Sequence, residues 1–363
     1  MRLKTEKMVL LNGIQTVQNI ISPKSALPIL SNILMSAQQG SLRLTATDLD
    51  MGISCVLSVD TPEAGMITVP AKRFGDIIRE LPAGDVDINT KKNNSVTITS
   101  GLCQFKIMGM PGEEFPKLPE FKDREAIKIE QAVLKEMLGL TAFAVSLDET
   151  RYILNGILFK IEQNKITLVA TDGKRLALIE KKLRDNSGKS VSVIIPVKTI
   201  HELSRNLQED GEVSLILNNN QVLFDLGKVV IISRLIEGEF PDYHQVIPEV
   251  CENQMKVSRN EFLLGVKRAS LLATPDYQAV KLELFKDKLV ISKSTPDIGE
   301  SREELSVEYK GKELAVGFNP GYLIDVLKNL PQEEVGFELS DSEKPGVIRM
   351  GDYTYIVLPM RLA

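Results

Sequence analysis

The chain has 363 residues, a hydrophobic fraction of 43% and a formal net charge of -5. This length suits two or three ordinary domains, and the apolar content allows each to bury a core. Because aromatic residues make up only 5% and Trp is absent, those cores are expected to be aliphatic. The acidic balance alone argues against nucleic-acid binding, although a basic lining can coexist with an acidic exterior.

Localisation signals and cysteines both favour a reducing interior. Residues 1–7 lead into a short amphipathic segment without a long apolar region, so no signal peptide is predicted. No apolar run reaches the length of a membrane span, which predicts no membrane partner. Cys55, Cys103 and Cys251 lack metal or redox spacing, as is typical of thiols in a reducing cytoplasm.

The first predicted elements are a helix, a set of strands and a second helix. Apolar residues at Leu10, Ile14, Val17 and Ile21 mark one face of the first helix. Residues 42–44 and similar stretches alternate with period two, which predicts half-buried antiparallel strands. The second helix follows Val69-Pro70 and places Phe74, Ile77, Ile78 and Leu81 on one face, so two helices and several strands form one unit.

This unit recurs twice along the chain. Pro196 and Pro320 precede helices like the one after Pro70, at intervals of 126 and 124 residues. Ala46-Thr47-Asp48 recurs as Ala170-Thr171-Asp172, and the Phe-Pro pair at residues 115–116 recurs at residues 240–241. A period of this length is a whole domain and not a solenoid unit, so one fold is used three times.

The third copy has diverged most. Its counterpart of the Ala-Thr-Asp strand is residues 289–295, and the chain ends where a third Phe-Pro loop would begin. The predicted class is α+β, with an antiparallel sheet and two helices in each domain. The predicted domains are residues 1–122, 123–247 and 248–363.

Basic residues recur on the polar faces of the second helices. Arg79, Arg205 and Lys328 stand two places before the closing leucines, and Lys72 and Lys198 share another repeat position. Taken singly, each of these cations is explained as an ordinary residue on the solvent-exposed face of a helix. Recurrence in three diverged copies favours a shared role, because surface charges usually drift.

Several motifs resemble one bacterial family. They are Leu27-Pro28-Ile29-Leu30, residues 151–156, residues 170–177, Phe240-Pro241-Asp242-Tyr243 and residues 358–362. In order and spacing they are similar to the DNA polymerase III beta subunit, the replication sliding clamp, over essentially the whole chain. The resemblance implies a non-catalytic processivity factor: a head-to-tail homodimer that closes a ring of six domains around duplex DNA, with helices lining the pore and sheets outside.

The resemblance also implies sequence-independent DNA contacts. Basic side chains that attract phosphate would hold DNA and still permit sliding. Asp148 stands where relatives can carry an amide, and an acid there would repel phosphate, so that contact is not carried over. The expected DNA-contacting residues are Lys24, Lys72, Arg79, Tyr152, Ile153, Lys198, Arg205 and Lys328.

A hydrophobic peptide pocket is the second implied surface. Its partners would be the replicative polymerase catalytic subunit, an ATP-driven clamp loader and other clamp-binding peptides. Leucine, valine and methionine side chains would form an apolar slot, with arginines oriented toward carboxylates or carbonyls at its rim. The matching positions are Leu154, Thr171, Gly173, Lys174, Arg175, Leu176, Pro241, Val246, Ile356, Val357, Leu358, Pro359, Met360 and Arg361.

The implied ring seam joins the first domain of one chain to the third domain of the next. An apolar centre with charged surroundings suits such a contact. Arg73 fits both pore and seam, and the seam is favoured. The seam positions are Arg73, Gln104, Ile107, Leu271, Leu272, Glu300, Glu303 and Glu304.

Other functional classes are weaker. His201 and His244 lie in different copies and form no catalytic triad or zinc pattern. Asp48 and Asp172 recur, but they more plausibly end a strand and organise its turn than act as catalytic carboxylates. No cofactor or metal is therefore predicted. A monomeric protein-interaction scaffold that never encircles DNA is the alternative, and a hydrolase built on repeated domains is a weaker one.

Overall fold

The computed structural model describes residues 1–21, 27–119, 121, 125–184, 190–249 and 251–362. The chain divides into two compact units. The first unit comprises residues 1–132 and 201–235, and the second comprises residues 133–200 and 236–363. Each unit therefore contains one predicted outer domain and part of the middle domain.

Two antiparallel sheets form the first unit. The smaller has five strands in the order β5 (Asp60–Glu63), β1 (Arg2–Glu6), β7 (Asp85–Thr90), β8 (Ser95–Ser100) and β9 (Cys103–Met108). The larger has nine strands in the order β10 (Met110–Pro111), β6 (Gly65–Pro70), β2 (Asn32–Gln38), β3 (Ser41–Thr47), β4 (Met51–Ser58), β18 (Val229–Arg234), β17 (Gln221–Asp225), β16 (Glu212–Asn218) and β11 (Ile127–Glu130).

The second unit also has two antiparallel sheets. One has nine strands in the order β15 (Val191–Pro196), β12 (Gly156–Glu162), β13 (Lys165–Thr171), β14 (Arg175–Lys182), β27 (Tyr353–Val357), β26 (Gly346–Met350), β25 (Glu334–Leu339), β19 (Asn253–Ser258) and β23 (Glu308–Tyr309). The other has four strands in the order β22 (Gly299–Ser306), β21 (Lys288–Thr295), β20 (Val280–Phe285) and β24 (Leu314–Phe318).

The six α-helices of the described residues follow the predicted repeat. Each repeat holds a first helix, namely α1 (Lys7–Gln18), α3 (Gln131–Thr141) or α5 (Arg259–Ser270). Each also holds a second helix, namely α2 (Ala71–Glu80), α4 (Val197–Asn206) or α6 (Pro320–Asn329). The prediction that Ile21 continues the first helix is wrong, because α1 ends at Gln18.

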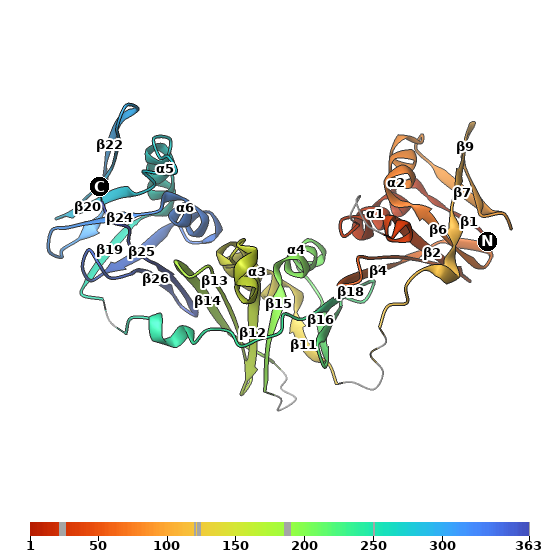
Figure 1. Cartoon of the computed structure of the whole chain (residues 1–363), viewed down its shortest axis with the longest axis horizontal. Coiled ribbons are helices and arrows are strands. Elements are labelled where there is room, and N and C mark those ends of the chain that lie inside the picture. The colour runs from red at the N-terminus through yellow and green to blue at the C-terminus, as the bar shows by residue number, and fades with distance from the viewer. Residues whose placement is uncertain (22–26, 120, 122–124, 185–189, 250, 363) are drawn as a thin grey trace. The chain divides into compact units, whose positions relative to one another are not determined.

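Helix pairs cover one face of a sheet. In the first unit α1 lies beside α2 and packs on β3 and β4, and in the second unit α5 lies beside α6 and packs on β21 and β22 (Figure 1). Leu10, Ile14, Phe262 and Val266 are fully buried at these contacts. The cores are aliphatic and aromatic side chains are a minority in them, as the composition predicts.

Strand pairing joins different repeats into one sheet. β4 of the first repeat pairs with β18 of the second, with Ile53 opposite Ile231. β14 of the second repeat pairs with β27 of the third, with Leu176 opposite Ile356. Each nine-stranded sheet therefore runs across a predicted domain boundary.

The Ala-Thr-Asp motif forms the same turn in its two copies. The Asp48 carboxylate accepts hydrogen bonds from the backbone N–H groups of residues 50 and 51, at 3.1 and 2.7 Å. The Asp172 carboxylate accepts from the N–H groups of residues 174 and 175, at 2.9 and 3.0 Å. Both aspartates organise a turn at a strand end, as predicted.

Candidate functional site

An apolar cavity of about 170 Å³ lies in the second unit. Its walls come from the β13–β14 turn, from the 3-10 helix η5 (Tyr243–Val246), and from the end of β27. Leu176 and Ile356 form part of its floor and belong to a buried hydrophobic cluster. The predicted pocket residues that the cavity brings together are Leu154, Thr171, Gly173, Lys174, Arg175, Leu176, Pro241, Val246, Ile356 and Leu358.

The β13–β14 turn shapes one wall of this cavity. The Thr171 hydroxyl donates to the carbonyl of Arg175 at 2.5 Å and accepts from the N–H of Gly173 at 3.0 Å. Gly173 has a φ of 85°, in the left-handed region that favours glycine. The turn therefore delivers Arg175 and Leu176 from the second repeat to the side of β27 from the third.

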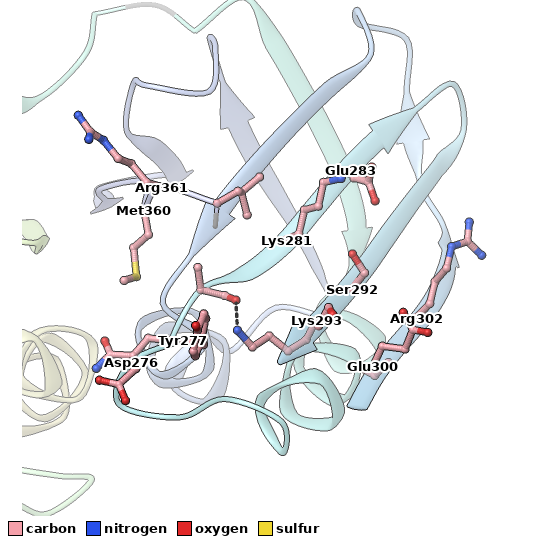
Figure 2. Close-up of a pocket in the computed structure, with 15 residues that line it drawn as sticks. Asp276, Tyr277, Lys281, Glu283, Ser292, Lys293, Glu300, Arg302, Met360 and Arg361 are labelled. Atoms are coloured by element: carbon pink, nitrogen blue, oxygen red, sulfur yellow. Dashed lines mark hydrogen bonds and ion pairs between the residues drawn. The ribbon is translucent and has the colours of Figure 1, made fainter. Parts of the chain in front are cut away.

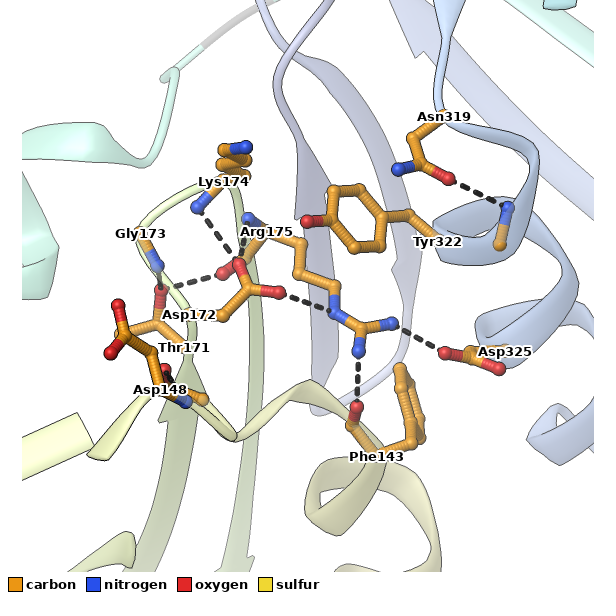
Figure 3. Close-up of polar contacts among 12 residues, drawn as sticks. Phe143, Asp148, Thr171, Asp172, Gly173, Lys174, Arg175, Asn319, Tyr322 and Asp325 are labelled. Atoms are coloured by element: carbon orange, nitrogen blue, oxygen red, sulfur yellow. Dashed lines mark hydrogen bonds and ion pairs between the residues drawn. The ribbon is translucent and has the colours of Figure 1, made fainter. Parts of the chain in front are cut away.

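Arg175 holds the back of this wall (Figure 3). Its guanidinium pairs with Asp172 at 3.1 Å and with Asp325 of α6 at 2.7 Å, and it donates to the carbonyl of Phe143 at 2.5 Å. The guanidinium carbon also lies 4.5 Å from the ring centroid of Tyr322. Arg175 thus ties the second repeat to the third inside the second unit.

The electrostatics of this network favour the charged arginine. Burial lowers the pKa of Arg175, but the hydrogen bond to Asp325 and the charges of Asp172 and Asp325 raise it above its ordinary value. The side chain is only 9% exposed. The resemblance implied that Arg175 orients a ligand at the rim, whereas in the structure its guanidinium binds groups of its own chain and holds the walls together.

Four predicted pocket residues lie outside this cavity. Val357 is fully buried, and Pro359 is half-buried beyond the cavity wall. Met360 and Arg361 line a separate, larger cavity in the same unit. The hydrogen bond from the N–H of Met360 to the carbonyl of Gly317, at 2.8 Å, directs the C-terminal segment toward that second cavity.

Two lining residues, Asp242 and Tyr243, were not among the predicted pocket residues. Asp242 begins η5 by accepting a hydrogen bond from the N–H of His244 at 3.1 Å. Tyr243 is 8% exposed and belongs to the hydrophobic cluster beneath the cavity. Both stand in the Phe240-Pro241-Asp242-Tyr243 motif, which was itself the signal that could have identified them.

The predicted DNA-contacting cations are exposed on the second helices of the repeats. Lys72, Lys198 and Lys328 are exposed, while Arg79 pairs with Asp76 at 2.8 Å and Arg205 pairs with Glu202. These pairs lie within one turn of their helices, so part of each arginine's charge is offset locally. Lys24 lies outside the described residues.

Tyr152 and Ile153 lie on the 3-10 helix η4 (Glu149–Leu154), and the Tyr152 side chain is 58% exposed. Asp148 caps this helix by accepting hydrogen bonds from the N–H and hydroxyl of Thr150, at 3.0 and 2.7 Å. These bonds hold the pKa of Asp148 below its ordinary value. Its role in the structure is to shape the loop that presents Tyr152.

The predicted seam residues divide between the two units. Arg73 on α2 and Gln104 on β9 are exposed, but Ile107 is buried within the first unit. In the second unit Leu271 is 80% exposed after α5 and Leu272 is half-buried beside it. On β22, Glu300 is exposed, Glu303 pairs with Arg268 at 2.5 Å, and Glu304 pairs with Arg302 at 2.6 Å.

Comparison with known proteins identifies the family. Profiles of the N-terminal, central and C-terminal domains of the DNA polymerase III beta subunit match residues 1–119, 128–242 and 244–361. The beta sliding clamp of Pseudomonas aeruginosa is 34% identical over 368 residues, covering 100% of both chains. That of Chlamydia muridarum is 32% identical over 352 residues, covering 97% of this chain and 96% of the relative.

Solved structures agree with the sequence comparisons. The sliding clamp of Pseudomonas aeruginosa bound to griselimycin superposes with a TM-score of 0.95 at 33% identity, covering 100% of both chains. The DNA polymerase sliding clamp of Bacillus subtilis superposes with a TM-score of 0.94 at 32% identity, with the same coverage.

The fold and its repeats thus define a three-domain clamp. The chain belongs to the DNA polymerase III beta subunit family. It is a DNA sliding clamp, a processivity factor of replication and not an enzyme. Within the described part of the chain, no helix is long and apolar enough to cross a membrane.

Proposed function

We propose that two copies of the chain close head to tail into a ring around duplex DNA in the cytoplasm. The ring tethers the replicative polymerase, the clamp loader and other partners through the apolar cavity. The predicted domains 1–122, 123–247 and 248–363 are the repeated parts of this ring. The monomeric scaffold is not favoured, because the chain belongs to a family of clamps.

One observation about strand edges carries the proposal. β9, β18 and β27 are equivalent strands of the three repeats, and so are β4, β14 and β22. Within the chain β18 pairs with β4 and β27 pairs with β14. Among the described strands, β9 and β22 are the members of the two sets that pair on one side only.

Pairing β9 of one copy with β22 of the next repeats the join that the chain uses twice. A heterologous contact of this kind builds a ring when its rotation closes. Phe105 and Met108 on β9 are exposed, and so is Leu271 at the end of α5, the helix that packs on β22. Glu300, Glu303 and Glu304 lie on β22, and Arg73 and Gln104 supply polar partners on the first unit.

The exposed cations of the second helices supply the attraction to DNA. Phosphate contacts carry no sequence information, so Lys72, Lys198 and Lys328 can hold a duplex that still slides. Arg79 and Arg205 add to this lining when phosphate competes with Asp76 and Glu202. Lys24, Tyr152 and Ile153 are proposed to contact DNA from loops.

The apolar cavity is proposed to receive leucine or phenylalanine anchors from partner peptides. Its side chains are mostly apolar, and Val246 and Leu358 are 49% and 40% exposed at its mouth. A few buried anchors concentrate the binding energy of such an interface. Val357, Pro359, Met360 and Arg361 support the site from the C-terminal segment.

Removing residues 359–363 tests the peptide site. The expected result is loss of binding to a fluorescent peptide with Leu and Phe anchors, while the mass in solution stays that of a dimer. Leu176→Asp should have the same effect by placing a charge on the cavity floor, and Leu147→Asp, at an exposed position outside the cavity, is the matched control. Undiminished binding by both altered proteins would refute the site.

A further inference from the structure

A second cavity of about 500 Å³ adjoins the C-terminal segment in the second unit (Figure 2). It lies against the four-stranded sheet, between the loop of residues 276–279 and residues 360–362. This volume is within the range of small-ligand pockets. Glu300 of the proposed seam and Met360 and Arg361 of the proposed peptide site border it, but the clamp function described above gives no role to the buried Lys293 in its wall.

The wall of this cavity contains a buried lysine without an acidic partner. Lys293 on β21 is 6% exposed, and its ammonium donates to the carbonyl of Ala279 at 3.0 Å. Among the described residues, no carboxylate lies within ion-pair distance of it. Burial lowers the pKa of Lys293, and no neighbouring acid offsets that effect. A buried charge without a partner is costly, so a bound anion would stabilise it.

The repeat shows that this lysine is not required by the fold. The equivalent positions of the first two repeats, at intervals of 124 residues, are Thr45 and Val169. Both side chains are buried and uncharged. Ser301 lies directly opposite Lys293 in the β21–β22 ladder, and its buried hydroxyl has no hydrogen-bond partner among the described residues. A buried ammonium without an acidic partner and a hydroxyl without a hydrogen-bond partner therefore lie opposite each other in the cavity wall.

The other charges of the wall indicate the size of the anion. Lys281 pairs with Glu283 at 2.7 Å, and Arg302 pairs with Glu304, so these cations are already compensated. Arg361 is exposed and its side chain points away from Lys293 (Figure 2), whereas Asp276 and Glu300 add acids. Two acids in the wall would repel a doubly charged phosphate, so a single carboxylate suits the site better.

The C-terminal segment connects the two cavities. The N–H of Leu358 donates to the carbonyl of Lys174 at 2.9 Å, beside the apolar cavity. Two residues later Met360 stands in the wall of the second cavity, and its side chain extends toward the loop that carries Asp276 and Tyr277 (Figure 2). A peptide lying along this segment would contact both cavities.

We infer that the Lys293 cavity binds a carboxylate of the same partner peptides whose apolar anchors enter the Leu176 cavity. The inference rests on the proposed peptide site and adds a preference for an acidic residue flanking the anchors. Lys293 supplies the charge. A neutral side chain at the same place in the peptide would gain none of this attraction.

Matched synthetic peptides test this inference on the full chain. Each carries the same Leu and Phe anchors, extended at one end through a short glycine spacer by either aspartate or asparagine. Two pairs are needed, one for each end, and fluorescence anisotropy gives each Kd. In one pair the aspartate peptide should bind about tenfold more tightly, as expected for one charge-assisted hydrogen bond.

Variants assign that preference to the lysine. Lys293→Met should abolish the preference without weakening the asparagine peptide, and Lys293→Arg should retain it. Lys288→Met, on the same strand but outside the cavity, should leave it unchanged. The inference is overturned if neither pair shows a preference, or if the preference survives in Lys293→Met. If neither asparagine peptide binds the unaltered chain at all, the proposed peptide site itself fails.

Discussion

At the scale of single residues, the repeated Thr-Asp turn shows what one position requires. Gly173 in the second repeat has a φ of 85°, and Leu49 takes the equivalent place in the first repeat with a φ of 80°. Leucine pays a steric penalty in this left-handed region that glycine avoids. The motif predicted the turn, but a single sequence could not show that Leu49 is strained within it.

Leu49→Gly should therefore raise the free energy of unfolding by about 0.5–1 kcal/mol, the steric relief less the entropy cost of glycine. Little burial is lost, because the Leu49 side chain is 51% exposed. Urea denaturation measures the change. Leu49→Ala is the control and should bring no such gain, since alanine keeps the strained φ. Destabilisation by glycine would contradict this reading of the turn.

Arg175 makes a second prediction at this scale. Arg175→Met leaves Asp172 and Asp325 without their cation and should lower the free energy of unfolding by about 2 kcal/mol, less than for a fully buried pair because Asp325 is partly exposed. The affinity for a Leu- and Phe-anchored peptide should fall as well. Urea denaturation measures the loss of stability, and fluorescence anisotropy measures the loss of peptide affinity.

Arg361→Met serves as the comparison for stability, since Arg361 is exposed and makes no ion pair among the described residues. It should change the unfolding free energy by less than about 0.5 kcal/mol. If Arg175→Met and Arg361→Met lowered the unfolding free energy equally, the Arg175 network would not be a particular source of stability.

At the scale of elements, the sequence predicted where helices and strands lie, but not which strands pair with one another across the repeats. Leu10 and Ile14, spaced for a helix, and alternation around Leu42 identified elements through local periodicity. The pairing of Ile53 with Ile231, or of Leu176 with Ile356, joins residues far apart in the chain. No local pattern encodes such a partner, so the continuous sheets across domain boundaries were not predicted.

The β12–β15 contact gives a prediction for elements. A Cβ on Gly156 would lie 2.6 Å from the carbonyl oxygen of Ile195, on the neighbouring strand. Gly156→Ala should therefore push the two strands apart and lower the unfolding free energy by about 1–3 kcal/mol. Thermal or chemical denaturation provides the measurement.

Gly139 on α3 is the matched control, because its added Cβ would meet nothing within 4 Å. Gly139→Ala should raise the unfolding free energy by about 0.5–1 kcal/mol, since alanine favours the helix interior. The opposite signs separate backbone crowding from a general intolerance of alanine. A stable Gly156→Ala protein would argue against the close approach of these strands.

At the scale of the whole molecule, the repeat period predicted three copies of one fold, and motif order indicated the family. The apolar cavity was largely foreseeable, because residues 170–177 and 240–243 carry its walls. Its Arg175 network was not, since Asp325 is remote in sequence and α6 brings it close. The Lys293 cavity left no motif at all, because burial and missing partners are properties of the folded chain.

The proposed β9–β22 join predicts a dimer in solution. A dimer alone does not establish encirclement, because two chains can associate without enclosing anything. Phosphate attraction alone would also hold the protein on any DNA, with a strong dependence on salt. Topology distinguishes these cases, since only an enclosing ring depends on whether the DNA has ends.

The most direct measurement is therefore retention of the loaded protein on circular DNA, before and after a single cut linearises it, at a salt concentration that suppresses phosphate binding. An encircling clamp should stay on the intact circle and leave soon after the cut by sliding off the ends. Equal retention on circular and linear DNA, or rapid loss from both, would contradict the ring.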